Sequence, residues 1–265
     1  MVKILLSGAL GHMGRAVAEL AKEKYAGQVC ITAGVDAAQA AGTDNAGLCG
    51  TNGAFPVYST FEAVPADAGF DAVIDFSHFS LTRKLLEFCR ARKLALVLCT
   101  TAISTEDLER AGEISKVIPL FRSANMSLGI ALVKDLIKRA EKVLGSSFDV
   151  EIVERHHRRK VDAPSGTALA LAEAVNEAAG GGLTNIYDRA SRRSSRPQGE
   201  IGISSVRGGN IVGDHDVCFI GDNEIITVSH NALSRSLFAD GALRAALFVA
   251  GRAPGQYCMD DLLRE

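Results

Sequence analysis

The chain has 265 residues, of which 47% are hydrophobic and 23% charged, a length and apolar fraction that suit one or two domains with a substantial core. Its 29 basic and 31 acidic side chains give a formal net charge of −2, so we expect neither nucleic acid nor an anionic membrane as a partner. No apolar run approaches the roughly 20 residues that a membrane-spanning helix needs.

The six cysteines are scattered along the chain, and no two of them form a C-x-x-C pair. This spacing is typical of free thiols in a reducing compartment rather than of a disulfide framework or a zinc site. The apolar stretch Val2–Leu6 is too short for a signal peptide and runs straight into a glycine turn. We therefore expect a cytoplasmic protein without a metal centre.

The first part of the chain alternates between short apolar runs and longer amphipathic stretches. The predicted strands are Val2–Leu6, Val29–Val35, Ala72–Phe76, Leu94–Leu98 and Val117–Phe121, and the predicted helices are Met13–Lys24, Leu81–Arg92 and Thr105–Lys116. Ser104 precedes the last of these helices and is expected to cap it. Strands that alternate with helices predict an α/β fold with a Rossmann-type, doubly wound parallel sheet.

The pattern changes near Asn125. A long helix that ends at Leu144, a strand at Asp149–Arg155 and a helix at Thr167–Ala179 are followed by a Gly-, Ser- and Arg-rich stretch, Gly180–Gly199. That stretch is predicted to be a long loop, of a length that is usually mobile or functional. Strands are predicted at Glu200–Arg207, His215–Ile220 and Glu224–Ser229, and a final helix at Ser236–Val249. These elements predict a second, α+β domain.

The first predicted strand leads into a turn of spaced glycines, Gly8-Ala9-Leu10-Gly11-His12-Met13-Gly14. It is a variant of the dinucleotide fingerprint in which the middle glycine is moved by one position. Glycines let the backbone approach a pyrophosphate, and the N–H groups of the following helix point at it. Asp36 follows the second strand, where a carboxylate would accept hydrogen bonds from an adenosine ribose. The alternatives are a tight turn that binds nothing and, for Asp36, an ordinary turn residue.

Two further predicted strands end in small polar residues, Asp75-Phe76-Ser77 and Cys99-Thr100-Thr101. In an open α/β sheet, ligands bind in the crevice beyond the carboxyl ends of the strands. A nicotinamide ribose is expected at these positions; the alternative is that the residues only cap helices.

The most informative stretch is Glu154–Thr167, which reads E-R-H-H-R-R-K-V-D-A-P-S-G-T and joins a strand to a helix. Pro164–Thr167 is typical of a helix start, whose N–H groups and positive dipole end favour a carboxylate or phosphate. His156, His157 and Lys160 lie directly upstream, and imidazole exchanges protons near neutral pH. The pattern favours a site that binds an anionic substrate and exchanges protons with it.

Three other interpretations of this basic run agree less well with the sequence. A polyanion-binding patch fits poorly with the mild net charge and the lack of interleaved aromatic residues. A metal site fits poorly because adjacent histidines on a strand point to opposite faces and no Cys or carboxylate cluster completes the ligand set. A merely solvated surface fits poorly with the helix start beside it.

The stretch His156–Thr167 resembles the signature H-H-x-x-K-x-D-A-P-S-G-T of 4-hydroxy-tetrahydrodipicolinate reductases, also called dihydrodipicolinate reductases. The resemblance extends over nearly the whole chain. It includes the glycine turn, Asp75-Phe76-Ser77, Thr100-Thr101, Ala124-Asn125-Met126-Ser127, Val206-Arg207-Gly208-Gly209 and Ile211-Val212-Gly213-Asp214-His215.

The resemblance implies a dinucleotide-binding domain, residues 1–125 plus 237–265, and a substrate-binding and tetramerisation domain, residues 126–236. It implies reduction of 4-hydroxy-tetrahydrodipicolinate to tetrahydrodipicolinate with loss of water, in lysine and diaminopimelate biosynthesis. The hydride donor would be NADH or NADPH, the substrate a small dicarboxylate, and the assembly a homotetramer.

The residue roles follow from the same resemblance. His156 and Lys160 would exchange protons with the substrate. His157, Gly166 and Thr167 would hold the substrate's carboxylates. The cofactor contacts would be Gly8, Ala9, Leu10, Gly11, His12, Met13, Asp36, Cys99, Thr100, Thr101, Ser123, Ala124, Asn125 and Met126.

The chain departs from the family pattern at three positions. Cys99 and Ala102 stand where the family commonly has glycine, and Met126 stands where an aromatic is usual; each affects the expected cofactor contacts. NADH is expected to be preferred over NADPH, because Asp36 is followed by Ala37-Ala38-Gln39-Ala40-Ala41 without a cation for the extra phosphate. His12 or Arg15 could supply that cation instead.

Two alternative functions remain open on the residues alone. One is another two-domain dehydrogenase that acts on an imine or an amino acid. The other is a non-catalytic nucleotide-binding protein of the same fold, since a fold does not fix a function. The presence of His156 and Lys160 argues against the second alternative.

Overall fold

The computed structural model describes residues 1–38 and 55–265, so Gln39, Ala40, Ala41 and Cys49, which entered the sequence predictions, lie outside the described residues. The chain divides into a first unit, residues 1–127 with 236–265, and a second unit, residues 128–235. Among the described helices, none is long and apolar enough to cross a membrane.

The first unit is built on a seven-stranded sheet in the order β12-β6-β5-β4-β1-β2-β3. Its strands are β1 (Val2–Ser7), β2 (Val29–Val35), β3 (Val57–Tyr58), β4 (Ala72–Asp75), β5 (Ala95–Leu98), β6 (Pro119–Arg122) and β12 (Gly255–Tyr257). Its helices are α1 (His12–Glu23), α2 (Thr82–Arg92), α3 (Thr105–Ile114), α6 (Ser236–Val249) and α7 (Met259–Leu262), with 3-10 turns at Phe61–Ala63 and Phe79–Leu81. Every strand pair is parallel, which confirms the predicted doubly wound sheet.

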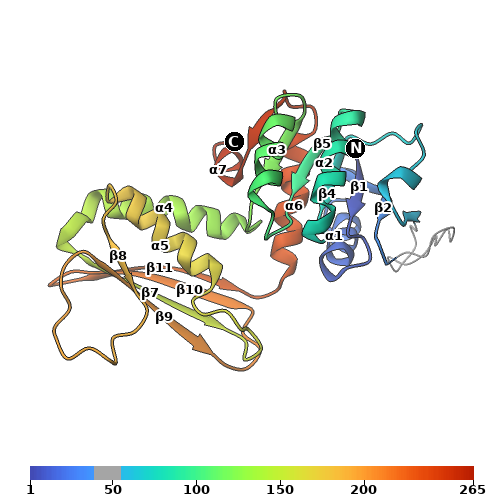
Figure 1. Cartoon of the computed structure of the whole chain (residues 1–265). Helices are drawn as coiled ribbons and strands as arrows, with labels where there is room; N and C mark the ends of the chain where they lie inside the picture. Colours follow the sequence, from blue (N-terminus) through green and yellow to red (C-terminus); the bar gives the residue numbers. More distant parts are fainter. Residues whose placement is uncertain (39–54) are drawn as a thin grey trace. The chain divides into compact units, whose positions relative to one another are not determined.

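Helices cover both faces of this sheet, as continuous apolar strands require. Leu5, Val73 and Leu96 share one core with side chains of α2 and α3. On the opposite face α1 packs against α6, which also contacts β1, β4 and β5 (Figure 1). The carboxyl ends of the parallel central strands therefore lie at one edge of the sheet. The polar residues that follow these strands in sequence lie at the same edge.

The structure contains the predicted cap of α3. Ser104 Oγ accepts a hydrogen bond from Asp107 N at 3.1 Å, which confirms the predicted cap of α3. The short elements β3, β12 and α7 were not predicted, because two to four residues carry too little periodicity to separate them from a loop.

The second unit has a five-stranded sheet in the order β11-β10-β7-β9-β8. Its elements are α4 (Leu128–Leu144), a 3-10 turn at Gly145–Ser147, β7 (Asp149–His156), α5 (Gly166–Ala178), β8 (Thr184–Ile186), β9 (Glu200–Arg207), β10 (Gly213–Ile220) and β11 (Ile225–Ala232). β7 and β9 are parallel, whereas β10 runs antiparallel to β7 and β11, which makes the sheet mixed. The helices α4 and α5 lie together on one face (Figure 1) and share an apolar core with the strands.

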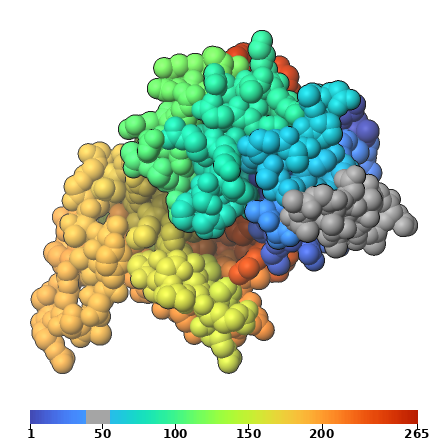
Figure 2. All heavy atoms as spheres, turned by 45° about the vertical axis from the view of Figure 1, so that its right-hand side comes forward, coloured from blue at the N-terminus to red at the C-terminus, as the bar shows by residue number. Residues whose placement is uncertain are grey.

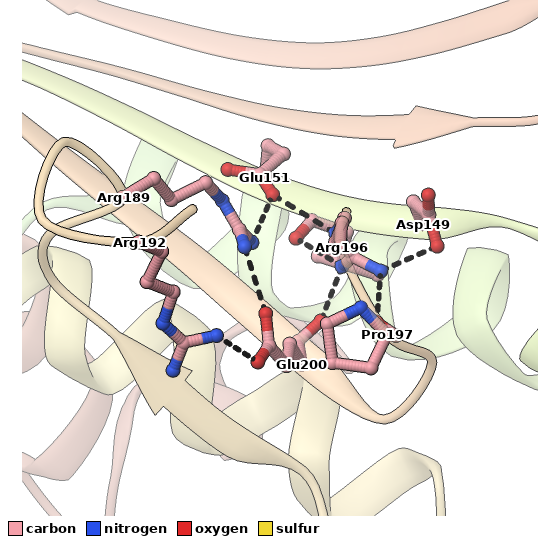
Figure 3. A network of polar contacts seen from close by, with 8 residues as sticks. Asp149, Glu151, Arg189, Arg192, Arg196, Pro197 and Glu200 are labelled. Carbon is pink, nitrogen blue, oxygen red and sulfur yellow. Dashed lines mark hydrogen bonds and ion pairs between the residues drawn. The ribbon is translucent and has the colours of Figure 1, made fainter. Parts of the chain in front are cut away.

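The prediction of one long loop at Gly180–Gly199 was wrong in part. Thr184–Ile186 forms β8, which pairs with β9. Ion pairs hold the remainder of this stretch against β7 and β9 (Figure 3). Arg189 binds Glu151 and Glu200 at 2.7 Å each, and Arg196 binds Asp149 at 2.5 Å. A local sequence pattern does not reveal these partners, because the carboxylates belong to β7 and β9 and meet the arginines only in the folded sheet.

Candidate active site

In the glycine turn of the first unit, the backbone of Gly8 packs closely against the backbone of Phe76. Gly8 has a φ of +78°, and a Cβ there would lie 2.6 Å from the carbonyl oxygen of Phe76, so only glycine fits. Gly11 is the N-cap of α1 and, as a glycine, has no side chain with which to cap the helix. The start of α1 is therefore open to an anion, as a dinucleotide pyrophosphate requires.

Asp36 lies directly beside this turn. Its Oδ2 accepts a hydrogen bond from Leu10 N, and its Oδ1 accepts one from Ala38 N, each at 2.9 Å. The half-buried carboxylate is thereby fixed next to the glycine turn. Arg15, which is exposed, donates from Nε to the carbonyl oxygen of Leu10 at 3.0 Å, so one cation stands near the same turn.

A pocket of about 260 Å³ lies where the first unit's central strands end. It is lined by Met13, Phe76, Ser77, Cys99, Thr100, Thr101, Ala124, Asn125, Met126 and Phe238. Seven of the predicted cofactor-binding residues thus meet in one place. Phe238 was not predicted, because α6 is far from the other lining residues in sequence and gave no local signal.

Buried hydrogen bonds hold the walls of this pocket. Asp75, which has no exposed surface, accepts from Thr100 Oγ1 at 2.5 Å and from Ser77 N at 3.1 Å, so it joins the ends of β4 and β5. Ser123 does not line the pocket. Its Oγ donates to the carbonyl oxygen of Asn125 at 2.6 Å and shapes the turn that carries Asn125.

The departures from the family pattern have different consequences here. Cys99 is buried, and burial, with Asp75 nearby, holds the pKa of its thiol well above the usual range, so it lines the pocket as an apolar group. Met126, which is 2% exposed, is packed as part of the pocket wall. Ala102 is exposed and has a φ of +57°, a left-handed conformation that costs a residue with a Cβ about 1–2 kcal/mol.

Replacing Ala102 by glycine is expected to stabilise the first unit. Glycine relieves the strain of the left-handed conformation, but it also increases the conformational entropy of the unfolded chain. The strain energy is the larger of the two contributions, so we expect the free energy of unfolding to rise by about 0.5–1 kcal/mol. Urea unfolding of both variants measures it. A stability equal to or below that of the parent would contradict the strain argument.

In the second unit, His156 is the last residue of β7 and only 11% of its side chain is exposed. Its Nδ1 lies 2.6 Å from Glu154 Oε2. Glu154 has no exposed surface; burial would raise its pKa, but hydrogen bonds from Arg207, Ser205, His156 and Ser165 N outweigh burial and lower the pKa to about 2. Glu154 is therefore an anion in the core of the site.

The segment from His157 to Ala163 lies on the surface, and Figure 2 shows this yellow stretch of chain protruding from the molecule. Lys160 Nζ pairs with Asp162 Oδ2 at 2.9 Å, and the lysine side chain is 22% exposed. Arg235 Nη2 lies 3.3 Å from His157 Nε2. Burial first, and then the charges of Arg159 and Arg235, lower the pKa of His157.

The start of α5 follows this segment. Ser165 is the N-cap, and its Oγ accepts a hydrogen bond from Ala168 N at 3.1 Å, which confirms the predicted helix start. Gly166 and Thr167 form the first turn, where a carboxylate finds N–H donors and the positive dipole end. The same Oγ lies 3.1 Å from Nε2 of His215, whose pKa burial lowers to about 4.

The structure adds residues that the sequence did not assign. Glu154, Arg207 and His215 surround His156 and the start of α5, and Arg235 contacts His157. Arg207 and His215 belong to the segments Val206–Gly209 and Ile211–His215, which were singled out by the family resemblance without a role. Within residues 1–38 and 55–265, no three His, Cys, Asp or Glu side chains are grouped so as to hold a metal ion.

Each unit thus offers one kind of chemistry. The first has an open helix start, a fixed carboxylate and a pocket at the strand ends, which fit a dinucleotide. The second has an imidazole oriented by a buried anion, an accessible ammonium group and a helix start, which fit an anionic substrate that takes up protons.

Two family models match this chain, one on each side of residues 127–128. The family described as "Dihydrodipicolinate reductase, N-terminus" matches residues 2–126, and "Dihydrodipicolinate reductase, C-terminus" matches residues 129–263. A 4-hydroxy-tetrahydrodipicolinate reductase of Caldanaerobacter subterraneus subsp. tengcongensis is 46% identical over 265 residues, 100% of this chain and 99% of that protein. The same-named protein of Clostridium tetani is 44% identical over 263 residues, 99% and 97% of the two chains.

Solved structures share the fold. The dipicolinate-bound dihydrodipicolinate reductase from Paenisporosarcina sp. TG-14 has a TM-score of 0.78 and 21% identity, with 97% of each chain covered. A probable dehydrogenase from Thermotoga maritima has a TM-score of 0.63 and 14% identity, with 98% of this chain and 92% of that chain covered.

Proposed function

The chain belongs to the dihydrodipicolinate reductase family, and from that premise we propose how its residues carry out the reaction of such an enzyme. The chain is a pyridine-nucleotide-dependent oxidoreductase of lysine and diaminopimelate biosynthesis. It reduces 4-hydroxy-tetrahydrodipicolinate to tetrahydrodipicolinate with loss of water. When bound, the reduced nicotinamide supplies the hydride.

One observation carries the assignment of the substrate site. The buried Glu154 accepts hydrogen bonds from both His156 Nδ1, at 2.6 Å, and Ser165 N, at 3.1 Å. A proton-exchanging imidazole is therefore held beside the start of α5, where a carboxylate binds. A substrate with two carboxylates and a ring that is protonated during the reaction matches this pairing of groups.

The residue roles are assigned as follows. The backbone of Gly166 and Thr167, with His157, binds the substrate's carboxylates. Lys160 adds positive charge and donates a proton, and His156 exchanges a proton through Nε2. Because Lys160 pairs with the 59% exposed Asp162 in the free protein, the pair is screened by water and is readily exchanged for a substrate carboxylate.

The first unit is proposed to bind the dinucleotide. The turn Gly8–Met13 and the start of α1 would hold the pyrophosphate, and Asp36 the adenosine ribose. The pocket at the ends of β4 and β5, with Cys99–Thr101 and Ser123–Met126 in its walls and supports, would receive the nicotinamide end. NADH is proposed as the preferred donor, because Asp36 repels the additional phosphate of NADPH and Ala37 supplies no cation. Thiols that are free in the described part of the chain support a reducing compartment, the cytoplasm.

The function is tested by coupling the protein to the enzyme that makes its unstable substrate and following the absorbance of the reduced nicotinamide. We expect consumption of the cofactor only when the upstream enzyme and both of its substrates are present. Consumption that does not depend on the upstream enzyme, or no consumption with either nicotinamide, would contradict the proposal.

A homotetramer is proposed from the second unit's sheet. The open face, defined here as the sheet face opposite α4 and α5, has no helix on it within the described residues of that unit (Figure 1). Ile225 on this face is 64% exposed and Val206 is 45% exposed. A sheet face without a helix layer, on which some apolar side chains are exposed, tends to be covered by a partner.

Light scattering at micromolar concentration is expected to give the mass of four chains of 28.0 kDa each. Ile225→Lys places a charge on the open face and is expected to lower that mass. Val143→Lys is the matched control, because Val143 is 84% exposed on α4 and away from the open face. A monomeric mass for the parent protein would refute the tetramer.

A further inference from the structure

The inference concerns the buried carboxylate of Glu154, and it rests on the function proposed above. Its two oxygens receive hydrogen bonds from Arg207, His156 and Ser165 N, and Ser205 also bonds to the carboxylate. Arg207 donates to both oxygens, at 2.8 Å and 2.7 Å, His156 Nδ1 lies 2.6 Å from Oε2, and Ser165 N donates to Oε1 at 3.1 Å. The side chain of Glu154 is 0% exposed and that of Arg207 is 19% exposed. A charge this deep in the protein is retained only when its partners are fixed.

The acceptor-only chemistry of Glu154 decides the tautomer of His156. An ionised carboxylate cannot donate a hydrogen bond, so Nδ1 of His156 must carry the proton that lies between them. In the neutral imidazole, Nε2 is then the unprotonated nitrogen, and it is the atom that exchanges protons with a substrate. The ring is also confined on its Nε2 side, because a Cβ on Gly213 would lie 2.9 Å from Nε2.

Arg207 fixes the orientation of the carboxylate in turn. Its guanidinium spans both oxygens of Glu154, a bidentate geometry that prevents rotation of the carboxylate. The same Nη2 donates to the carbonyl oxygen of Asp162 at 2.6 Å, so Arg207 ties Glu154 to the segment that carries Lys160. β7 and β9 are adjacent and parallel, and His156 is in register with Arg207, which places the arginine beside its partners.

We propose that Glu154, held by Arg207, is the positioning residue for His156. It fixes the Nδ1–H tautomer and the ring plane, leaves Nε2 to exchange the proton, and holds the start of α5 beside that nitrogen through Ser165 N. Glu154 acts on the substrate only through these groups. It need not touch substrate, cofactor or the reacting atoms.

The test is Glu154→Gln, which keeps the size of the side chain. The glutamine amide faces His156 with its NH₂ group if its oxygen keeps the bond from Ser165 N, since that N–H can only donate. His156 must then accept at Nδ1 and carry its proton on Nε2. We expect kcat to fall by about 10-fold or more, up to the loss expected for His156→Ala, with KM for the substrate nearly unchanged.

Two readouts separate positioning from a structural effect. The ¹⁵N chemical shifts of His156, in the full chain labelled at histidine and assigned with His156→Ala, are expected to switch from the Nδ1–H to the Nε2–H tautomer in Glu154→Gln. In the double variant with His156→Ala, the glutamine is expected to add no further loss of kcat, because the residue acts through a group that is gone.

A matched control and a second variant complete the design. Glu141→Gln changes another buried carboxylate of the second unit, which is 6% exposed and is not part of the site, and should leave kcat unchanged. If Glu154→Gln does not fold, Arg207→Lys is the second variant. It keeps a cation beside Glu154 but removes the bidentate hydrogen bonds of the guanidinium, and it should lower kcat with little change in KM.

Unchanged kcat in either folded variant, an unchanged tautomer of His156, or a fully additive loss in the double variant would overturn the proposal. The tautomer is measured without substrate, so it stands apart from the proposed reaction. If the parent protein fails the coupled assay while the tautomer switches as expected, the reaction is wrong and the positioning is right.

Discussion

Lys160→Ala is expected to lower kcat by about 100-fold or more. The lysine ammonium is needed more in the transition state than in substrate binding, because protonation of the ring assists the arrival of the hydride, and such proton transfers contribute about 10²–10⁴-fold. His156→Ala should lower kcat to a similar extent. Steady-state kinetics in the coupled assay, with substrate supplied by the upstream enzyme, measure both variants.

The control for the loss of a positive charge is Lys142→Ala, since Lys142 is an exposed residue of α4 in the same unit. It should turn over substrate like the parent. Near-normal kcat in both Lys160→Ala and His156→Ala would remove the candidate site from the second unit's basic segment altogether. A loss confined to KM in Lys160→Ala would restrict that lysine to binding the carboxylates.

NADH is expected to give the higher kcat/KM of the two nicotinamide donors, by roughly 5- to 150-fold. Asp36 is fixed by hydrogen bonds from Leu10 N and Ala38 N, so it cannot turn away from the ribose position when a phosphate replaces a hydroxyl. Repulsion together with a missing cation is worth about 1–3 kcal/mol, the scale of one charge-assisted hydrogen bond. Side-by-side kinetics with both donors measure the ratio.

Two variants test the cause of this preference. Ala37→Arg places a guanidinium directly after Asp36 and should shift the ratio towards NADPH. Arg15→Ala removes the cation that contacts the carbonyl oxygen of Leu10, and it should leave the preference for NADH in place. Equal or better efficiency with NADPH in the parent, lost in Arg15→Ala, would mean that Arg15 supplies the cation and that Asp36 and Ala37 do not set the preference.

The sequence alone predicted the features that depend on neighbours along the chain. Alternating apolar runs and amphipathic stretches indicated the parallel sheet, and Ser104 and Ser165 marked helix starts that the structure confirms. The motif at His156–Thr167 indicated the family, which the comparisons confirm. Such signals are local, because a cap or a periodic face is complete within a few residues.

Tertiary structure alone decided which distant groups meet. Glu154 and Arg207 are 53 positions apart and become partners only because β7 and β9 pair in register. The same holds for Arg189 and Arg196, whose ion pairs hold a predicted loop against β7 and β9, and for Phe238 of α6, which lines the pocket at the ends of β4 and β5. A buried charge is stable only beside its counter-charge, and the fold, through the pairing of strands that are remote in sequence, determines where that counter-charge lies.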